Sequence, residues 1–225
     1  MSAGPIGIFG GAFDPVHFGH LRTGFELLST LHLERLHWVP TGEPRHRDSA
    51  IADAALRVQM LQAAVAGESR FVVDARELQR QGPSYSLDTL LEFRTEWPRS
   101  PLCLILGMDA FLGLPLWHRW QELTSLAHLV VAHRPGWQPP EHGPLSSLLM
   151  QHRARDVAEL HGSTHGLVYV HAVTALDIAS SELRRIVLAG EDPRYLVPEP
   201  VRQIILESQC YARAQPAGEA QRTRD

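Results

Sequence analysis

Short apolar runs alternate with segments of helical periodicity along most of this chain. We expect strands in the apolar runs, which are Ile6–Phe9, Arg35–Val39, Phe71–Val73, Leu102–Leu106, Leu129–Ala132 and Val168–Val170. Helices are expected where apolar residues recur at helical spacing, which is from Gly19 onward and at Ala52–Val65, Ser86–Trp97, Ser181–Leu188 and Glu199–Glu207. Strands that alternate with helices form a mostly parallel sheet with helices on both faces. The pattern therefore predicts an α/β, Rossmann-like, doubly wound fold, in which ligands bind beyond the carboxyl ends of the strands.

The size of the chain indicates one domain. A chain of 225 residues, 44% of them apolar, can bury one sizeable core. We assign residues 1–211 to that domain and expect residues 212–225, which have almost no apolar content, to be disordered. No element is assigned to residues 136–165. Cys103 is expected in the core, and two distant cysteines give neither a disulfide framework nor a zinc signature.

The charge balance argues against a nucleic-acid partner. The net charge is −4 and all 21 basic residues are arginines, whereas a general nucleic-acid binder usually carries a basic excess. No apolar run approaches the roughly 18 residues of a membrane helix, and residues 1–5 lack the features of a signal peptide. We expect a cytoplasmic protein with no membrane partner. A homo-oligomer is compatible with the sequence, which leaves the oligomeric state open.

The segment Gly10–His20 (GGAFDPVHFGH) joins the first predicted strand to the first predicted helix. Its glycines do not fit the dinucleotide fingerprint GxGxxG, and the GxxxxGK loop requires a lysine that this chain lacks. Gly10 and Gly11 let the backbone approach a ligand, and Asp14-Pro15 predicts a turn.

His17 and His20 lie three residues apart at the start of the predicted helix, so they share one face. Helix N-termini favour anions, and the pair therefore predicts a phosphate site. Taken alone, such a pair is more often a capping histidine and a structural one. A metal site is not expected, because no third ligand stands at a sensible spacing.

The complete string, GG-x-FDP-x-H-x-GH, resembles the nucleotidyltransferase superfamily, whose hallmark is [HT]-x-G-H after the first strand. It is most similar to the nicotinate mononucleotide adenylyltransferase branch. Class I aminoacyl-tRNA synthetases share a similar histidine motif, but they also need a lysine-rich signature and a tRNA-binding body. The matches run from Ile6 to about Tyr211.

The resemblance implies an ATP site that includes a second signature, Ile178–Arg184, which is similar to I-S-[SA]-T-x-[IL]-R. Ala179 and Ser181 depart from that pattern, and Ser181 is still expected to cap the helix. Gly107-Met108-Asp109 is similar to the G-x-D that the family places near the adenosine, although Asp109 alone suggests a cap. The implied ATP-binding residues are Gly10, Gly11, Phe13, His17, His20, Gly107, Asp109, Ser180, Ser181 and Arg184. The implied catalytic residues are His17, His20 and Arg184, with Arg184 directed toward the β- and γ-phosphates.

The resemblance also implies a mononucleotide site. Pro44-Arg45-His46-Arg47 is similar to the family's Pro-Pro-His-[KR], and Gly82–Ser86 is similar to its G-P-S-Y-[ST], which meets the nicotinate carboxylate. In the family, an aromatic residue at the position of Trp117 stacks on the pyridine ring. Trp117 is therefore expected to stack, whereas Trp120 is expected in the core. The implied residues are His46, Arg47, Ser84, Tyr85, Ser86, Trp117 and Arg134. Each motif also has a simpler interpretation. Pro44–Arg47 would be a solvated loop and Gly82–Ser86 a turn with a helix cap, the two tryptophans would be core residues, and Arg134 would form a salt bridge.

The activity that the resemblance implies joins ATP to nicotinate mononucleotide, with Mg²⁺ accompanying ATP, and gives nicotinate adenine dinucleotide and pyrophosphate for NAD biosynthesis. A nicotinamide mononucleotide enzyme and phosphopantetheine adenylyltransferase are the nearest alternatives. A non-catalytic nucleotide sensor on the same fold is the alternative from another class.

Overall fold

Six parallel strands form one sheet in the residues that the computed structural model describes, which are 4–42, 52–133, 138–174 and 176–212. The strand order is β3-β2-β1-β4-β5-β6. Their bounds are β1 Ile6–Gly11, β2 Arg35–Pro40, β3 Phe71–Val73, β4 Leu102–Gly107, β5 His128–His133 and β6 Val168–Ala172. The order reverses between β1 and β4, so the carboxyl ends of these two neighbouring strands form the topological switch point of a doubly wound sheet. The predicted fold class is confirmed.

Helices follow most of the strands, as the alternating pattern predicts. Their bounds are α1 Phe18–Thr30, α2 Ala54–Val65, α3 Ser86–Glu96, α4 Met108–Leu112, α5 Pro144–His152, α6 Val157–Gly162, α7 Ser180–Leu188 and α8 Glu199–Ser208. Short 3₁₀ helices cover Arg76–Gln79, Leu114–Leu116 and Trp120–Ser125. Both α5 and α6 lie in the stretch to which the sequence analysis assigns no element.

Three helix starts differ from the prediction by one or two residues, since α2 begins at Ala54 rather than Ala52 and α7 at Ser180 rather than Ser181. The first helix begins at Phe18, with His17 as its N-cap, rather than at Gly19. Ser86 and Ser181 are not caps, because the N-caps of α3 and α7 are Tyr85 and Ala179, and neither cap side chain accepts a hydrogen bond. Serine at the second helical position of α7 lies inside the helix, where its hydroxyl cannot act as an N-cap.

The sheet buries two apolar clusters, one on each face. Alternate strand residues divide between them: Phe9, Trp38 and Ile105 belong to one cluster, and Ile8 and Leu104 belong to the other. Helices α1, α2 and α6 pack into the first cluster, together with α7 and α8, and helices α3, α4 and α5 pack into the second. Helices therefore cover both faces, as the period-two alternation of a buried strand requires.

Trp38 fills the centre of the first cluster and is fully buried. Its ring centroid lies 5.1 Å from that of Phe9, 5.6 Å from that of Phe13 and 5.2 Å from that of Phe71. Gly24 of α1 makes this packing achievable, because a Cβ atom at that position would lie only 2.5 Å from Cζ2 of the indole. The helix thus approaches β2 closely where its sequence carries glycine.

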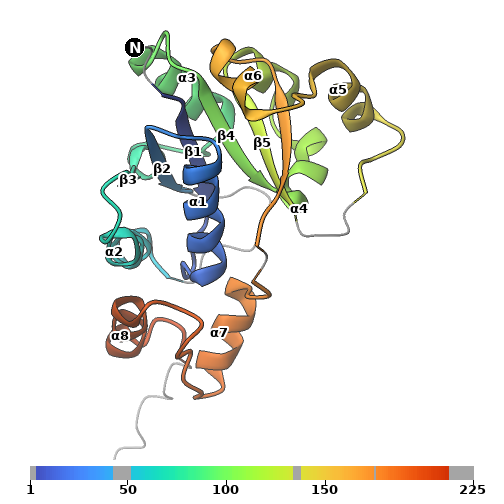
Figure 1. The fold of residues 1–225 in the computed structure, drawn as a ribbon. Helices are drawn as coiled ribbons and strands as arrows, with labels where there is room; N and C mark the ends of the chain where they lie inside the picture. The colour runs from blue at the N-terminus through green and yellow to red at the C-terminus, as the bar shows by residue number, and fades with distance from the viewer. Residues whose placement is uncertain (1–3, 43–51, 134–137, 175, 213–225) are drawn as a thin grey trace, which may run out of the picture.

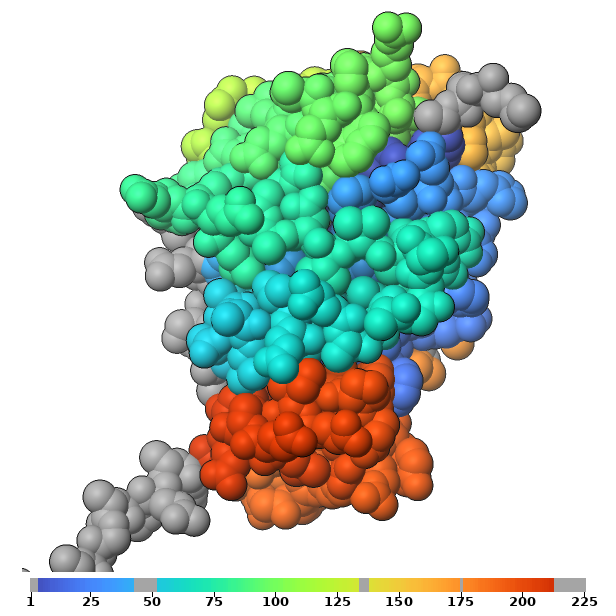
Figure 2. Space-filling view, turned by 90° about the vertical axis from the view of Figure 1, so that its left-hand side faces the viewer, coloured from blue at the N-terminus to red at the C-terminus, as the bar shows by residue number. Residues whose placement is uncertain are grey.

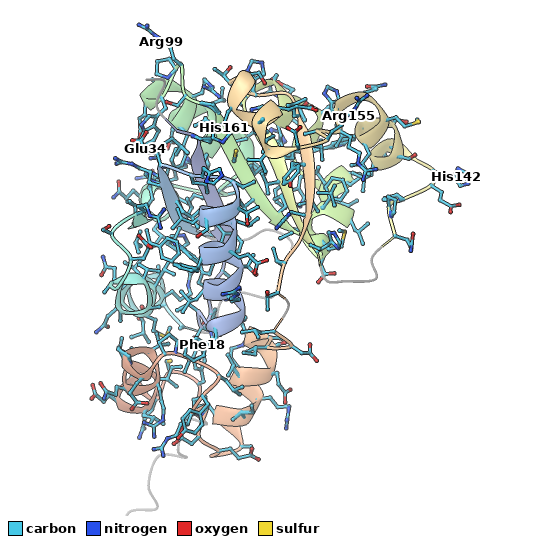
Figure 3. The ribbon with its side chains drawn as sticks, in the orientation of Figure 1. Phe18, Glu34, Arg99, His142, Arg155 and His161 are labelled. Atoms are coloured by element: carbon cyan, nitrogen blue, oxygen red, sulfur yellow. The ribbon has the colours of Figure 1, made fainter. Side chains whose placement is uncertain are left out.

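Helices α7 and α8 lie together beyond the carboxyl edge of the sheet, below the start of α1 (Figure 1). Phe18 marks that end of α1, whereas Glu34 and Arg99 lie at the opposite edge of the molecule (Figure 3). The surface of α8 is continuous with that of α2 (Figure 2), against which it packs. Among the described helices, none has the length and apolar character needed to cross a membrane.

Candidate active site

The turn between β1 and α1 is buried and anchored on several sides. Phe13, Asp14, Val16 and His17 are each at most 4% exposed. The peptide bond between Asp14 and Pro15 is cis, and these two residues form the predicted turn. The Phe13 side chain faces Trp38 and His20 in the core, so any contact of Phe13 with ATP would come from its backbone.

His17 and His20 face each other at the start of α1. Their ring centroids lie 3.8 Å apart with an interplanar angle of 28°. The Nδ1 atom of each ring is buried and has no hydrogen-bond partner among the described residues. Buried polar atoms are normally paired, so the two unpaired nitrogens indicate a site for a ligand that supplies hydrogen-bonding atoms.

Both imidazoles are neutral near pH 7. Burial lowers the pKa of His17 to about 4. Burial also lowers the pKa of His20 well below its usual value, and repulsion from a charged His17 lowers it further. Desolvation disfavours the charged form of a histidine. The rings would therefore act toward an anion as neutral N–H donors, and an anion that raised their pKa would make them charged N–H donors.

These shifts predict a pH-dependent stability. The unfolded chain binds protons on His17 with a pKa of about 6.5, and the folded chain does so only near pH 4. Stability from this residue is therefore fully present above about pH 6.5 and is lost as the pH falls toward 4. The difference corresponds to about 3 kcal/mol. Urea unfolding of the wild type and His17→Gln at several pH values should show the stability difference between them shrinking toward acid by roughly this amount.

The exposed His142, before α5, provides the control, because His142→Gln should leave the pH curve unchanged. Parallel curves for the wild type and His17→Gln would contradict the depressed pKa.

The N-terminus of α1 offers two donors beside the histidines. The N–H of Phe18 donates to the carbonyl of Leu196 at 3.2 Å. The N–H groups of Gly19 and His20 have no hydrogen bond to the described residues. Gly19 also leaves room for the first ring, since a Cβ atom there would lie 3.0 Å from Nδ1 and Cε1 of His17. The glycine of the histidine motif thus preserves the ring's position.

Helix α7 brings the second signature against the same turn. Ser180 Oγ donates to the carbonyl of Pro15 at 3.0 Å. Arg184 Nη1 donates to the carbonyl of Asp14 at 2.7 Å and lies 3.7 Å from its carboxylate. Ser181 is exposed. Ser180 and Arg184 therefore contact the turn between β1 and α1, which we call the histidine turn. The side chain of Arg184 contacts Asp14 in this turn rather than projecting away from the protein.

Gly107 and Asp109 stand at the end of β4, the strand beside β1 across the switch point. Gly107 is the N-cap of α4, and Asp109 is exposed in the first turn of that helix. Gly10 and Gly11 end the adjacent strand, where Gly10 is exposed. These residues lie at the same carboxyl edge of the sheet, but among the described residues no side-chain contact joins Asp109 to the histidines.

The residues predicted for the mononucleotide form a second group. Tyr85 stacks on His118, with ring centroids 4.4 Å apart and an interplanar angle of 29°. Ser84 Oγ donates to the carbonyl of Glu77 at 3.2 Å. Trp117 and Trp120 are both half-buried against the second cluster, so the expectation of a core position for Trp120 is only partly met.

The two tryptophans do not share a helix, because Trp117 is the C-cap of one 3₁₀ helix and Trp120 begins the next. Arg119 between them has a left-handed backbone. His46, Arg47 and Arg134 lie outside the described residues.

The two groups of residues adjoin through the end of β2. The N–H of Thr41 donates to the carbonyl of Gly11 at 2.9 Å. A Cβ atom on the next residue, Gly42, would lie 2.9 Å from Ser84 Oγ. A short path of contacts thus runs from the histidine turn to the segment Gly82–Ser86.

Sequence reasoning missed five buried polar residues that support the site. Arg57 Nη1 donates to the carbonyls of Ala12 at 2.8 Å and Thr41 at 3.0 Å. Thr89 Oγ1 donates to Glu77 at 2.6 Å, and burial raises the pKa of Glu77. The remaining two are Asp14 and Tyr211. A signal existed for Arg57, which is the one charged residue of α2, whereas Tyr211 carries no local signal.

No group of three or more His, Cys, Asp or Glu side chains suited to a metal ion occurs in the parts of the chain described here.

The sequence and the fold of this chain are similar to those of known proteins over most of its length. A model of the cytidylyltransferase-like family matches residues 8–186. The chain is 45% identical over 207 residues to "Probable nicotinate-nucleotide adenylyltransferase" of Aeromonas hydrophila, which covers 92% of this chain and 97% of the relative. It is 43% identical over 209 residues to the protein of the same name from Methylococcus capsulatus, covering 92% and 100%. Among solved structures, Plasmodium falciparum nicotinic acid mononucleotide adenylyltransferase complexed with NaAD shares the fold, with a TM-score of 0.71 at 15% identity and coverage of 92% and 97%.

Proposed function

The chain belongs to the nicotinate-nucleotide adenylyltransferase family, and from this premise we propose that it joins ATP to nicotinate mononucleotide, releasing pyrophosphate, in NAD biosynthesis. The observation that carries the proposal is the stacked pair His17 and His20, whose unpaired nitrogens lie at a helix N-terminus on the switch point of the sheet. Such an edge is where doubly wound sheets bind nucleotides.

The reaction needs no general base. An oxygen of the mononucleotide 5′-phosphate, already anionic at neutral pH, attacks the α-phosphorus of ATP in line. The bond from that phosphorus to the α–β bridging oxygen breaks, and pyrophosphate leaves with the electron pair. Catalysis then consists of positioning the two phosphates and stabilising the charge that develops.

On the ATP side, the two imidazoles and the N–H groups of Gly19 and His20 are suited to the α-phosphate, because each can donate a hydrogen bond. Arg184 and the serines at the start of α7 are assigned to the leaving pyrophosphate. The remaining residues proposed for ATP are Gly10, Gly11, Phe13 through its backbone, Gly107 and Asp109. Their support is their shared place at the carboxyl edge of β1 and β4.

On the mononucleotide side, the N-terminus of α3 is suited to the nicotinate carboxylate. The helix begins at Ser86 with Tyr85 as its cap, and helix N-terminal N–H groups favour an anion over a neutral amide. Trp117 lies next in the chain to His118, which stacks on Tyr85, and this nearness supports a role for Trp117 at the pyridine ring. His46, Arg47 and Arg134 complete the proposed set.

Mg²⁺ belongs to the ATP substrate in this proposal. The ion keeps much of its water and prefers phosphate oxygens, and it would neutralise part of the charge of the ATP phosphates during the reaction. Chelation of Mg²⁺ is therefore expected to stop turnover without unfolding the protein.

The test is pyrophosphate release from ATP with nicotinate mononucleotide, nicotinamide mononucleotide or phosphopantetheine. We expect turnover with the first substrate and a kcat/KM for it at least about tenfold above the second, a difference of about 1.4 kcal/mol. ATP binding by titration without pyrophosphate release would favour a sensor and contradict the proposal. Preference for either other acceptor would assign a different substrate.

A further inference from the structure

Asp14 joins distant parts of the chain beneath the proposed ATP site. Asp14 is only 3% exposed. Tyr211 Oη donates to Asp14 Oδ1 at 2.6 Å, across 197 residues of sequence. The N–H of Ala52 donates to the same oxygen at 3.2 Å. The hydrogen bond between Tyr211 and Asp14 joins two buried polar groups that are far apart in the sequence. It attaches the C-terminal segment to the turn between β1 and α1.

Two arginines hold the backbone on either side of that carboxylate. Arg184 Nη1 donates to the carbonyl of Asp14, and Arg57 Nη1 donates to the carbonyls of Ala12 and Thr41. The turn that leads to His17 is therefore fixed from α2, from α7 and from the residues after α8.

The hydroxyl of Tyr211 acts as a hydrogen-bond donor to Asp14. Its side chain is 3% exposed and belongs to the first apolar cluster. Burial raises the pKa of Tyr211, and the hydrogen bond to Asp14 raises it further. The hydroxyl therefore stays protonated at physiological pH and donates to the carboxylate, which is the strong form of a hydrogen bond.

The position of Asp14 matters because it stands three residues before His17 and also contacts Arg184. A displacement of Asp14 would move both proposed phosphate contacts together. Tyr211 itself lies behind the turn, since its hydroxyl is bound to Asp14 inside the core. Its influence on the reaction would therefore pass through Asp14.

We propose that Tyr211 is a positioning residue for the proposed reaction: its hydroxyl anchors Asp14 and thereby sets the place of the histidine turn and of Arg184. This inference rests on the proposed function for its kinetic meaning. It differs from a purely structural role, in which the hydroxyl would only attach the end of α8 to the domain.

The first experiment compares the wild type with Tyr211→Phe, which removes the hydroxyl and keeps the ring. We expect kcat/KM for ATP to fall roughly 10- to 100-fold, the scale of a small misplacement of reacting groups, and the melting temperature to fall by several degrees. Tyr195→Phe is the matched control, because Tyr195 follows α7 and its side chain is 85% exposed. A kcat/KM within twofold of the wild type, with only the melting temperature lowered, would overturn the proposal.

A double-mutant cycle with Asp14→Asn separates positioning from stability. If Tyr211 acts through Asp14, the losses in kcat/KM will be clearly less than additive in the double variant. Additive losses would overturn the proposal. Should Tyr211→Phe be too unstable to assay, Asp14→Asn alone decides, and a kcat/KM equal to that of the wild type would count against the inference.

Failure of the proposed function would look different. In that case the wild type would release no pyrophosphate from ATP and nicotinate mononucleotide. The inference would then be read from the ATP dissociation constant, which we expect to rise severalfold in Tyr211→Phe and to stay unchanged in Tyr195→Phe. Equal affinity in the wild type and Tyr211→Phe would overturn it.

Discussion

His20→Ala is expected to lower kcat by about 10²–10³-fold, comparable with the loss of one preorganised donor at a developing charge. The ring stands 3.8 Å from that of His17, and its Nδ1 atom has no partner in the described residues. Removing it deletes a donor that would act on the transition state. Steady-state kinetics under saturating ATP measures the effect.

The control for this variant is His142→Ala, whose side chain projects from the loop before α5, far from the first turn (Figure 3). It should turn over like the wild type. Near-normal turnover of a folded His20→Ala protein would refute the role of the histidine pair.

Trp38→Ala is expected to cost about 3–5 kcal/mol of folding free energy, because a fully buried tryptophan leaves a cavity that the surroundings fill only in part. Domains are stable by only about 5–15 kcal/mol, so this single change would remove much of the total. Three aromatic rings pack on the indole. Urea unfolding at pH 7 gives the value.

Leu116→Ala is the companion measurement, because this side chain is 79% exposed and its truncation should change stability by less than about 0.5 kcal/mol. A loss below about 1 kcal/mol for Trp38→Ala would mean that the core relaxes around the missing ring.

The strands were predictable because each contains a short apolar run, even though the edge strands β3 and β6 are only partly buried. Helix starts were less so, since a difference of one residue in cap position leaves the periodicity unchanged. The stretch 136–165 has weak periodicity, and α5 is set off by Gly143, which has a positive φ, and Pro144 rather than by an apolar pattern.

The histidine site was predictable for a different reason. His17 and His20 are near each other in sequence, so helical geometry alone brings their rings together. The contact of Tyr211 with Asp14 depends on how α8 folds back onto α2, and no local pattern encodes it. The resemblance placed Tyr85 and Trp117 at one site, but the stacking of Tyr85 involves His118, to which the sequence analysis gave no role.

The central place of β1 has a consequence for how the protein fails on heating. This strand lies between β2 and β4 and is covered on both faces, so exposing it requires the surrounding sheet to open as well. Segments of that kind exchange their amide hydrogens only through global opening events. The turn that carries the two imidazoles grows directly out of this strand, and heat inactivation should therefore coincide with cooperative melting instead of preceding it.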